Sequence, residues 1–371
     1  MFICLLLTHI PNPRINKRIE ALKNIAEIKV ICTRRASQNI WEPLQNVEHI
    51  IFDIDLPTAS HMVKRYAVSK EFQKKAIEKL EELKPNVIYA EGLDPLMIAS
   101  KYKKYHDVKI IFEVADLREN YIEVPKRLKD RILTKILLRR EADVLKSVDY
   151  LVVTSPKFYE MHYCNLISKD KTLFIPNSPD IEVFKEYHKK NVGIFTVGFI
   201  GGIRYLNQMK MLVDVAKELG VNVLFAGAGG TSLEYDEIKS YCDGLENVTF
   251  TGKYSYDSEI AGLYGRVDCV YAVYDADNPN VRIALPNKLY ESIICELPII
   301  VAKNTYLSEL VEEWQIGMSV KHNSSEDLKQ ALYKLVNDRN YYNVLSDNCR
   351  VLKDRFLDNS WKDSLYTFVN N

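Results

Sequence analysis

The residues whose types and spacing best suit chemistry lie in the segment Ala284-Leu-Pro-Asn-Lys-Leu-Tyr-Glu291. Pro286 suits the first turn of a helix and Asn287 can cap it. A helix N-terminus favours an anion, and Lys288 in the first turn makes sense if it faces a phosphate. Glu291 follows on the same face, where its carboxylate could accept both hydroxyls of a ribose. The segment alone equally fits an ordinary amphipathic helix in which Lys288 and Glu291 are solvated.

Two glycine clusters precede this segment in the same half of the chain. Gly201 and Gly202 follow an apolar run, and Arg204 next to them offers a forked donor for diphosphate oxygens. Gly227 lies at the end of another apolar run. Each cluster alone is typical of a tight turn. Together with Lys288 they predict a nucleotide site, because all three segments follow expected strands of one domain.

Short aliphatic runs alternate with longer amphipathic segments along nearly the whole chain, which predicts an α/β fold with parallel sheets. We expect two doubly wound Rossmann-like domains that face each other across a cleft. The expected parts are an N-terminal domain (1–180), a polar linker (181–192), a C-terminal domain with the predicted nucleotide site (193–355) and a helix crossing back to the first domain (356–371). The expected strands are 2–7, 28–32, 87–91, 109–114, 150–154, 172–175, 193–200, 221–226, 248–251, 269–273, 298–302 and 317–320.

Composition narrows the class of protein. Fifty basic residues balance fifty acidic ones among 371, so there is no global attraction to nucleic acid. The seven cysteines are odd in number and contain no CxxC pair, which argues against a disulfide framework or a zinc site and favours a reducing compartment. The first apolar run is too short for a signal peptide, and no run approaches the ~20 residues of a membrane span. We therefore expect a cytoplasmic protein.

A basic stripe suggests a second kind of partner. The stripe consists of Arg127, Arg131, Lys135 and Arg139, spaced four residues apart. An apolar stripe adjoins it, formed by Leu128, Ile132, Leu133, Ile136 and Leu137. Such a helix could lie on an anionic membrane surface, which would make the protein peripheral on the inner face. The alternative is a crossover helix that buries its apolar face against its own sheet while the cations are solvated.

The order of motifs resembles the retaining GT-B glycosyltransferases, in particular glycosyltransferase family four, the group 1 enzymes. The matching segments of the second half are Gly198-Phe-Ile-Gly-Gly-Ile-Arg204, Phe225-Ala-Gly-Ala-Gly-Gly230, Asn247-Val-Thr-Phe-Thr-Gly252 and Pro286-Asn-Lys-Leu-Tyr-Glu291 with the Pro-Ile-Ile-Val run after it. Those of the first half are Asn12-Pro-Arg-Ile-Asn-Lys-Arg18, Lys84-Pro-Asn-Val-Ile-Tyr89, Tyr150-Leu-Val-Val-Thr-Ser155 and Ile175-Pro-Asn177. The resemblance spans nearly the full length.

The resemblance implies that 1–180 is the acceptor-side domain and 193–355 the nucleotide-sugar-binding domain, and it implies roles for particular residues. Arg204 and Lys288 would be the catalytic residues that clamp the donor diphosphate, and Glu291 would hold the ribose. Further donor contacts are implied at Gly201, Gly202, Gly227, Pro286 and Asn287. On the acceptor side we expect His9, Arg14, Asp116 and Glu119.

The sequence departs from the family pattern at three places. Ile283 stands where the family often has a glutamate, and Ala115 stands where many members have a histidine. The family also has a lysine shortly after the arginine, for which Asn207 or Gln208 could stand in.

The expected reaction is transfer of a sugar from a UDP- or GDP-sugar, with retention, to a glycan or lipid-linked acceptor in surface polysaccharide or glycoconjugate synthesis. Neither a cofactor nor a metal is expected, since cationic side chains and a helix terminus stabilise the departing diphosphate. Asp275 and Asp277 have the spacing of a metal-binding pair, but we favour their loop as a contact to the donor sugar. Two alternatives remain, a nucleotide-sugar 2-epimerase of the same architecture and a non-catalytic partner subunit. Ile283 is the feature that keeps the second alternative open.

Overall fold

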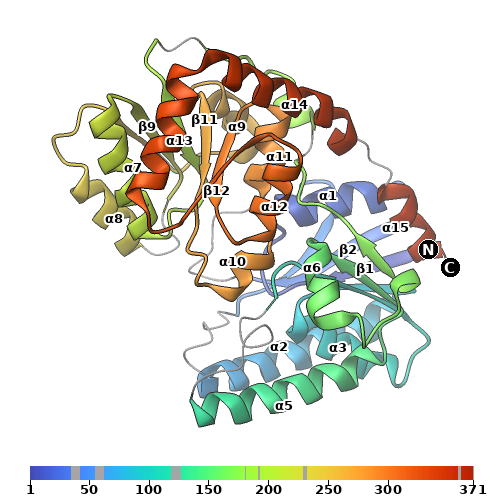
Figure 1. Cartoon of the computed structure of the whole chain (residues 1–371). Helices are drawn as coiled ribbons and strands as arrows, with labels where there is room; N and C mark the ends of the chain where they lie inside the picture. Colours follow the sequence, from blue (N-terminus) through green and yellow to red (C-terminus); the bar gives the residue numbers. More distant parts are fainter. Residues whose placement is uncertain are drawn as a thin grey trace. The chain divides into compact units, whose positions relative to one another are not determined.

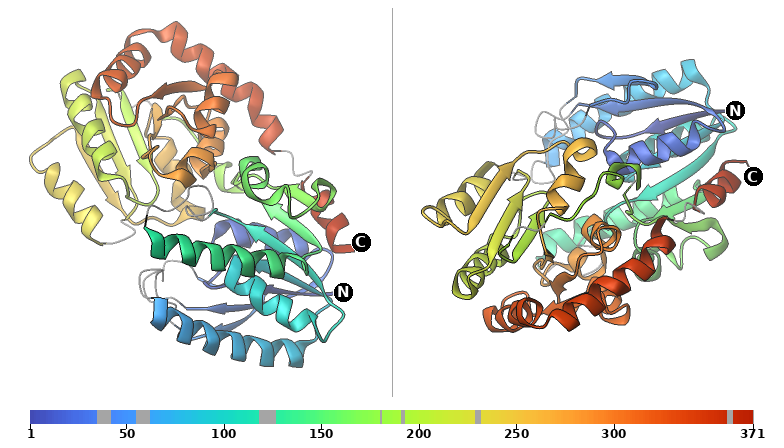
Figure 2. Two further views of the ribbon diagram at one scale, coloured as in Figure 1. Left: turned by 60° about the horizontal axis from the view of Figure 1, so that its bottom comes forward. Right: turned by 90° about the horizontal axis from the view of Figure 1, so that it is seen from above.

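The computed structural model describes residues 1–34, 42–54, 62–117, 127–179, 181–190, 193–228, 232–357 and 361–370. The chain divides into two compact units, Met1–Pro176 together with Asn359–Asn371, and Asn177–Asp358. Each unit has a parallel sheet with helices on both faces, as Figures 1 and 2 show. The predicted pair of Rossmann-like sheets is therefore confirmed.

Unit 1 contains a seven-stranded sheet in the order β3-β2-β1-β4-β5-β6-β7. Its strands are β1 (Phe2–Leu6), β2 (Glu27–Thr33), β3 (Glu48–Phe52), β4 (Val87–Glu91), β5 (Lys109–Val114), β6 (Tyr150–Val153) and β7 (Thr172–Phe174). Its α-helices are α1 (Pro13–Leu22), α2 (Met62–Leu83), α3 (Leu93–Lys103), α5 (Leu128–Leu145), the short α6 (Pro156–Phe158) and α15 (Trp361–Asn370). Strand order reverses between β1 and β4, and the carboxyl ends of strands at such a point form a crevice.

The last helix of the chain belongs to the core of unit 1. Trp361, Leu365 and Val369 of α15 are buried in the cluster that also contains residues of α1 and β1. Tyr366 donates a hydrogen bond to the carbonyl oxygen of Ala21 at 3.0 Å. Figure 1 shows α15 beside α1, although the two helices are at opposite ends of the sequence.

Unit 2 contains a six-stranded sheet in the order β10-β9-β8-β11-β12-β13. Its strands are β8 (Thr196–Ile200), β9 (Asn222–Ala226), β10 (Val248–Gly252), β11 (Cys269–Ala272), β12 (Ile299–Ala302) and β13 (Gly317–Val320). Its helices are α7 (Leu206–Leu219), α8 (Ser232–Tyr241), α9 (Tyr256–Tyr264), α10 (Pro279–Ile283), α11 (Asn287–Ile294), α12 (Tyr306–Glu313), α13 (Ser325–Asn337) and α14 (Arg339–Leu357). Here the strand order reverses between β8 and β11, which predicts a ligand crevice at their carboxyl ends.

Residues 181–190, expected in a linker, pack on unit 2. Phe184 is buried and its ring lies 6.0 Å from that of Tyr264. Tyr187 donates a hydrogen bond to the carbonyl oxygen of Cys295 at 2.9 Å. These contacts anchor the described part of the segment.

No helix in the described part of the chain is both long enough and apolar enough to cross a bilayer.

Candidate active site

The two glycine clusters and Lys288 meet at the carboxyl end of β8. A Cβ atom on Gly201 would lie 2.7 Å from the Lys288 Nζ, and one on Gly227 would lie 2.0 Å from the Gly201 carbonyl oxygen. Both glycines have positive φ, 140° for Gly201 and 130° for Gly227. The Gly201 N–H donates to the Ala226 carbonyl oxygen at 2.8 Å. Glycine is thus required at both positions, whereas Gly202 is exposed and has open space around its Cα.

Helix α11 brings Lys288 to these glycines. Its N-cap is Pro286, and no side chain caps the helix by a hydrogen bond. Asn287 is the first helical residue, so the prediction that it caps the helix is wrong. Pro286 takes the cap position itself, and the first-turn N–H groups keep no side-chain acceptor from the cap.

Lys288 is a buried cation, not the solvated one of the alternative interpretation. It is 8% exposed, and its Nζ lies 4.4 Å from the centroid of the Phe199 ring and 5.7 Å from that of Tyr274. Burial lowers the pKa of Lys288 to about 8; the nearby Glu291 carboxylate raises it and the Arg204 charge lowers it. Aromatic faces compensate part of the lost hydration of the ammonium group.

Glu291 is also buried, and two tyrosines hold it in place. Tyr256 donates to its Oε1 at 2.8 Å and Tyr264 to its Oε2 at 2.6 Å. Burial raises the pKa of Glu291, against the opposing effect of these two hydrogen bonds and of Lys288. Each carboxylate oxygen has a second lone pair, so the group retains the capacity to accept from ribose hydroxyls.

Arg204 lies in the turn between β8 and α7, and its side chain is exposed. Its charge is close enough to add to the lowering of the pKa of Lys288 by burial and to oppose the rise that burial causes in the pKa of Tyr274. Of the two stand-ins expected for the missing lysine, Asn207 is exposed, whereas Gln208 is buried and donates to the His322 carbonyl oxygen at 3.1 Å. Gln208 is therefore engaged within the fold, which the sequence did not indicate.

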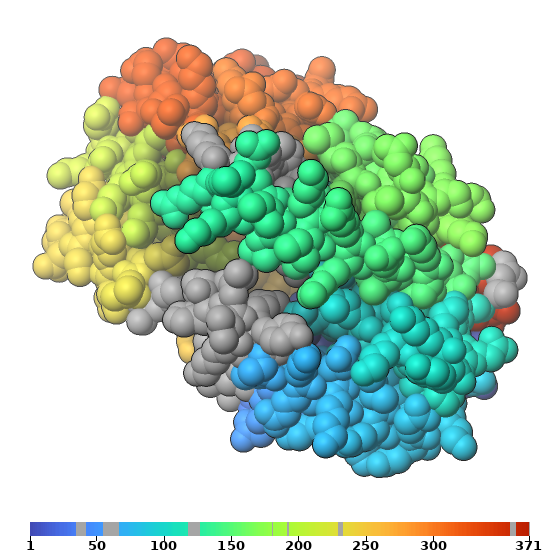
Figure 3. All heavy atoms as spheres, turned by 90° about the horizontal axis from the view of Figure 1, so that it is seen from below, coloured from blue at the N-terminus to red at the C-terminus, as the bar shows by residue number. Residues whose placement is uncertain are grey.

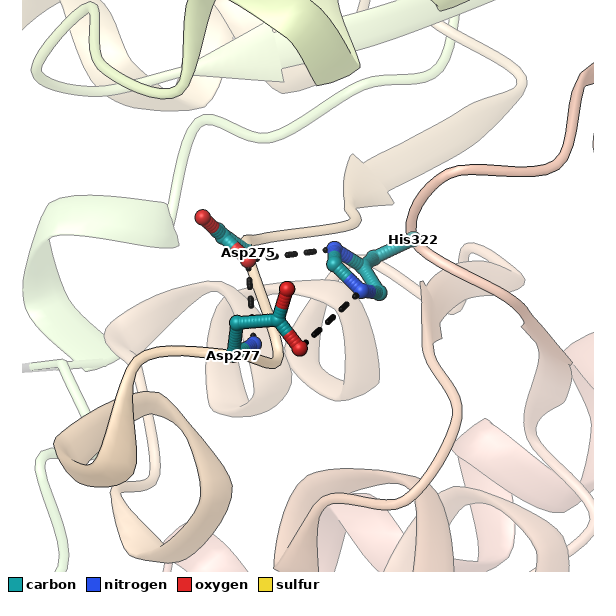
Figure 4. A group of neighbouring side chains, drawn as sticks. All are labelled: Asp275, Asp277 and His322. Carbon is teal, nitrogen blue, oxygen red and sulfur yellow. Dashed lines mark hydrogen bonds and ion pairs between the residues drawn. The ribbon is translucent and has the colours of Figure 1, made fainter.

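The Asp275–Asp277 loop meets His322, as Figure 4 shows. The His322 Nδ1 lies 3.1 Å from an Asp275 carboxylate oxygen, and its Nε2 lies 3.8 Å from one of Asp277. Asp275 also accepts the Asp277 N–H at 3.0 Å. One ligand atom from each residue lies within 4.8 Å of the others, so the three could offer oxygen and nitrogen ligands to a cation. A direct contact of the His322 ring with Asp275 accounts for the same geometry without a cation.

A second group of charges occupies the carboxyl ends of β1 and β4 in unit 1. The His9 Nε2 lies 3.1 Å from the Glu91 Oε2, and Arg14 pairs with the other oxygen of Glu91. Glu113, the register partner of Glu91 on β5, lies 3.2 Å from the Arg14 Nε and 3.4 Å from the Arg18 Nε. Burial acts to raise the pKa of Glu91, but Arg14 and His9 outweigh it and hold that pKa at about 2. The two arginines thus stabilise two adjacent buried carboxylates.

A pocket of about 370 Å³ opens beside this network. It is lined by Thr8, His9, Glu91, Gly92, Leu93, Asp94, Pro95, Phe112, Val114, Ala115, Asp116, Leu117, Glu141 and Tyr163. Glu141 accepts hydrogen bonds from His162 at 2.8 Å and from Tyr163 at 3.2 Å.

The pocket brings together only some of the residues predicted for the acceptor side. His9 and Asp116 line it, whereas Arg14 lies in the charge network next to it. Glu119 lies outside the described residues. Sequence reasoning missed Glu91 and Glu113, although each is an acid inside an otherwise apolar strand. That pattern is a usable signal for a buried functional or structural charge.

Comparison with known proteins agrees with this geometry. Residues 194–338 match the family model described as "Glycosyl transferases group 1". The succinoglycan biosynthesis protein ExoL of Rhizobium meliloti (strain 1021) is 23% identical over 264 residues, which are 67% of this chain and 64% of that protein. The matched region therefore spans somewhat less than two thirds of that relative.

Solved structures resemble the whole chain. Sucrose-phosphate synthase from Thermosynechococcus elongatus aligns with a TM-score of 0.78 at 14% identity, over 100% of this chain and 98% of that one. Anabaena HepE in complex with UDP-glucose aligns with a TM-score of 0.73 at 14% identity, over 100% and 99%. A UDP-GlcNAc 2-epimerase from Neisseria meningitidis aligns over the full length of both chains at 12% identity, with a lower TM-score of 0.64.

Three observations agree with the resemblance found in the sequence. They are the match of residues 194–338, the strand order of both sheets, and the meeting of Gly201, Gly227 and Lys288. Residues 194–338 thus match the group 1 glycosyltransferases, and the whole chain has the two Rossmann-like sheets of the GT-B fold.

Proposed function

We propose that the protein transfers a sugar from a UDP- or GDP-sugar to a glycan or lipid-linked acceptor, in the synthesis of a surface polysaccharide or glycoconjugate. The observation that supports this most directly is the buried ammonium of Lys288 against the backbone of Gly201, at the strand-order reversal of unit 2. An anionic diphosphate at this place would provide the partner that the buried cation lacks in its own surroundings. Two similar proteins support the proposal: ExoL is a succinoglycan biosynthesis protein, and HepE has been solved in complex with UDP-glucose.

The chemistry requires stabilisation of a leaving group. The bond between the anomeric carbon and the diphosphate oxygen breaks, and its electron pair stays on the diphosphate. An acceptor oxygen bonds to the same carbon, and its proton passes to the departing diphosphate oxygen. Lys288, Arg204 and the N-terminus of α11 would stabilise the developing negative charge without a metal, while Glu291 orients the ribose. Retention of configuration is part of the proposal because the family resemblance implies it.

The pocket of unit 1 is the place we propose for the acceptor. Its volume of about 370 Å³ falls within the usual range for small-molecule sites, roughly 300–1,000 Å³. Glu91, Asp94 and Asp116 give it carboxylate oxygens, which suit the hydroxyl groups of a sugar. His9 adds a ring nitrogen at the same wall.

Calorimetry with UDP and GDP, followed by a panel of nucleotide sugars, tests the proposal. One of the two nucleotides should bind, and its sugar donors should be cleaved with release of the nucleoside diphosphate. An NMR spectrum of the first-formed product then gives the anomeric configuration. Conversion between two nucleotide sugars epimeric at C2 would instead identify an epimerase, and binding without turnover across the panel would identify a non-catalytic subunit.

A further inference from the structure

Helix α5 carries an apolar ridge on the side that faces away from its own sheet. The ridge consists of Leu128, Ile132 and Ile136, which are 70%, 54% and 44% exposed. A spacing of four residues places them on one face of the helix. Thr134, Glu141 and Leu145 are the buried residues of α5, and they mark the face on which the helix rests. The apolar ridge is therefore left outside, contrary to the usual orientation of an amphipathic helix.

Exposed cations surround the ridge. They are Arg127, Lys129, Arg131, Lys135, Arg139 and Arg140. Asp130 is the one acid in the stretch 127–140. Across the described chain, no carboxylate forms an ion pair with any of these six side chains. Figure 3 shows α5, in green, at the surface of unit 1.

Helix α2 of the same unit shows what a solvated helix looks like in this protein. Its Lys74, Lys75 and Lys79 each have a glutamate within 4.0 Å, three or four residues away on the same helix. Their charges are therefore locally compensated, whereas no described carboxylate pairs with the cations around the α5 ridge. The difference between the two helices argues against explaining the α5 cations as ordinary solubilising residues.

We propose that α5 docks on a membrane that contains anionic lipids. The ridge would enter the boundary between headgroups and acyl chains, while the surrounding cations meet lipid phosphates. A bilayer offers an apolar layer and a negative surface side by side, which is the combination that the helix presents. A protein partner fits less well because protein interfaces exclude charged residues from their apolar core. A second copy offers no acidic surplus, since the chain has a formal net charge of zero.

Sedimentation with vesicles tests the proposal. The wild type should sediment with phosphatidylcholine vesicles that contain phosphatidylglycerol and remain in the supernatant with phosphatidylcholine alone. The triple variant Arg131→Glu, Lys135→Glu, Arg139→Glu should lower the partition constant by about 100-fold or more. High salt should have a similar effect on the wild type, since exposed charges are screened beyond ~10 Å at 0.1 M salt. The double variant Ile132→Ser, Ile136→Ser should bind more weakly at low salt too, because it removes the apolar contribution.

Matched controls distinguish an effect of α5 itself from a general effect of net charge or of exposed apolar side chains. The triple variant Lys74→Glu, Lys185→Glu, Lys329→Glu changes the net charge equally at side chains that are 79%, 64% and 44% exposed. The double variant Val344→Ser, Val351→Ser removes apolar side chains that are 52% and 79% exposed on α14. Both controls should sediment like the wild type. Equal loss of binding in these controls, or no vesicle binding by the wild type at low salt, would overturn the proposal.

Two further measurements make the result independent of folding and of the proposed function. Nucleotide binding by calorimetry should be the same in the wild type and both α5 variants, because α5 belongs to unit 1 and the proposed donor residues belong to unit 2. Sedimentation velocity without vesicles should show the same species for the wild type and both α5 variants. A larger species that only the α5 variants lose would identify the ridge as a contact between copies, and the membrane proposal would be wrong.

Discussion

A buried lysine without an ion-pair partner is costly, and Lys288 is such a residue within the described part of the chain. Its pKa falls from 10.5 to about 8 because burial removes water from the ammonium group. At about 1.4 kcal/mol per pH unit, this corresponds to roughly 3 kcal/mol of folding free energy. A protein keeps a cost of this size where function needs it. The energetic cost therefore supports a functional role for Lys288, as its position beside Gly201 also does.

Removal of either cation tests the diphosphate clamp. Lys288→Ala and Arg204→Ala should each lower donor turnover by roughly ten- to a thousandfold, because each removes a charge-assisted contact of about 1.5–4 kcal/mol where negative charge develops. The measurement is kcat/KM for the nucleotide sugar. Lys217→Ala, a lysine of the last turn of α7, serves as a control and should leave turnover unchanged. Wild-type turnover in either clamp variant would remove that residue from the mechanism.

The pKa of Lys288 also predicts a pH dependence. Only the protonated ammonium attracts a diphosphate, so affinity for the nucleoside diphosphate should fall as the pH rises through about 8. Calorimetry between pH 7 and pH 9.5 measures this fall, and Lys288→Ala should lack it. The sign for stability is opposite. The unfolded chain holds the proton between about pH 8 and 10.5, so the free energy of unfolding of the donor-free protein should rise with pH in this window.

At the scale of elements, the sequence predicted the sheets well because parallel strands are buried on both faces and read as continuous apolar runs. It missed β3, whose residues Glu48–Phe52 are at best half-buried at the edge of the sheet. The meeting of Gly201, Gly227 and Lys288 was predictable, because carboxyl ends of neighbouring parallel strands lie at one edge. The burial of Lys288 was not predictable, because it depends on aromatic rings that come from other elements.

The charge network of unit 1 was likewise not predictable from the sequence. Glu91 and Glu113 lie side by side on β4 and β5, where two like charges would repel each other. Arg14 and Arg18, one turn apart on α1, compensate them. The sequence contains all four residues, but only the pairing of β4 with β5 and the position of α1 reveal that they form one network. The exposure of the α5 ridge is another such case, since the sequence left its burial open.

The loop between β11 and α10 gives a test at the same scale. Asp275 and Asp277 come from this loop and His322 follows β13. If the loop contacts the donor sugar and no metal acts, activity should survive EDTA, because Lys288, Arg204 and the α11 terminus stabilise the leaving group. The measurement is turnover before and after chelation, with magnesium or manganese added back. Loss of activity that either metal restores would move the three residues into a metal site and contradict the proposed mechanism.

At the scale of the whole molecule, unit 1 is built from two segments that are far apart in the sequence. The chain leaves unit 1 after Pro176, completes unit 2, and returns to unit 1 with Asn359–Asn371. Unit 1 therefore needs the last residues of the chain to complete its core, whereas unit 2 is one continuous segment. A polypeptide synthesised from its N-terminus would complete unit 1 last.

This organisation predicts that defects in α15 weaken unit 1 and leave the donor site intact. Leu365 is fully buried among residues of α1 and β1, so Leu365→Ala should destabilise unit 1 by about 2–5 kcal/mol. Leu332→Ala, equally buried on α13, is the matched change in unit 2. Hydrogen exchange should then accelerate in β1, β2 and α1 for the first variant and in β9 and α7 for the second.

Nucleotide binding supplies the second readout of the same prediction. A ligand stabilises only the folded state that binds it, by an amount that grows with concentration over Kd. UDP or GDP should therefore slow exchange in unit 2 of the Leu365→Ala variant as in the wild type, with unchanged affinity. The Leu332→Ala variant should bind nucleotide more weakly if unit 2 opens measurably. Equal acceleration of exchange in both units by Leu365→Ala alone would mean that the two units unfold as one cooperative body, and that α15 controls the donor site as well as its own core.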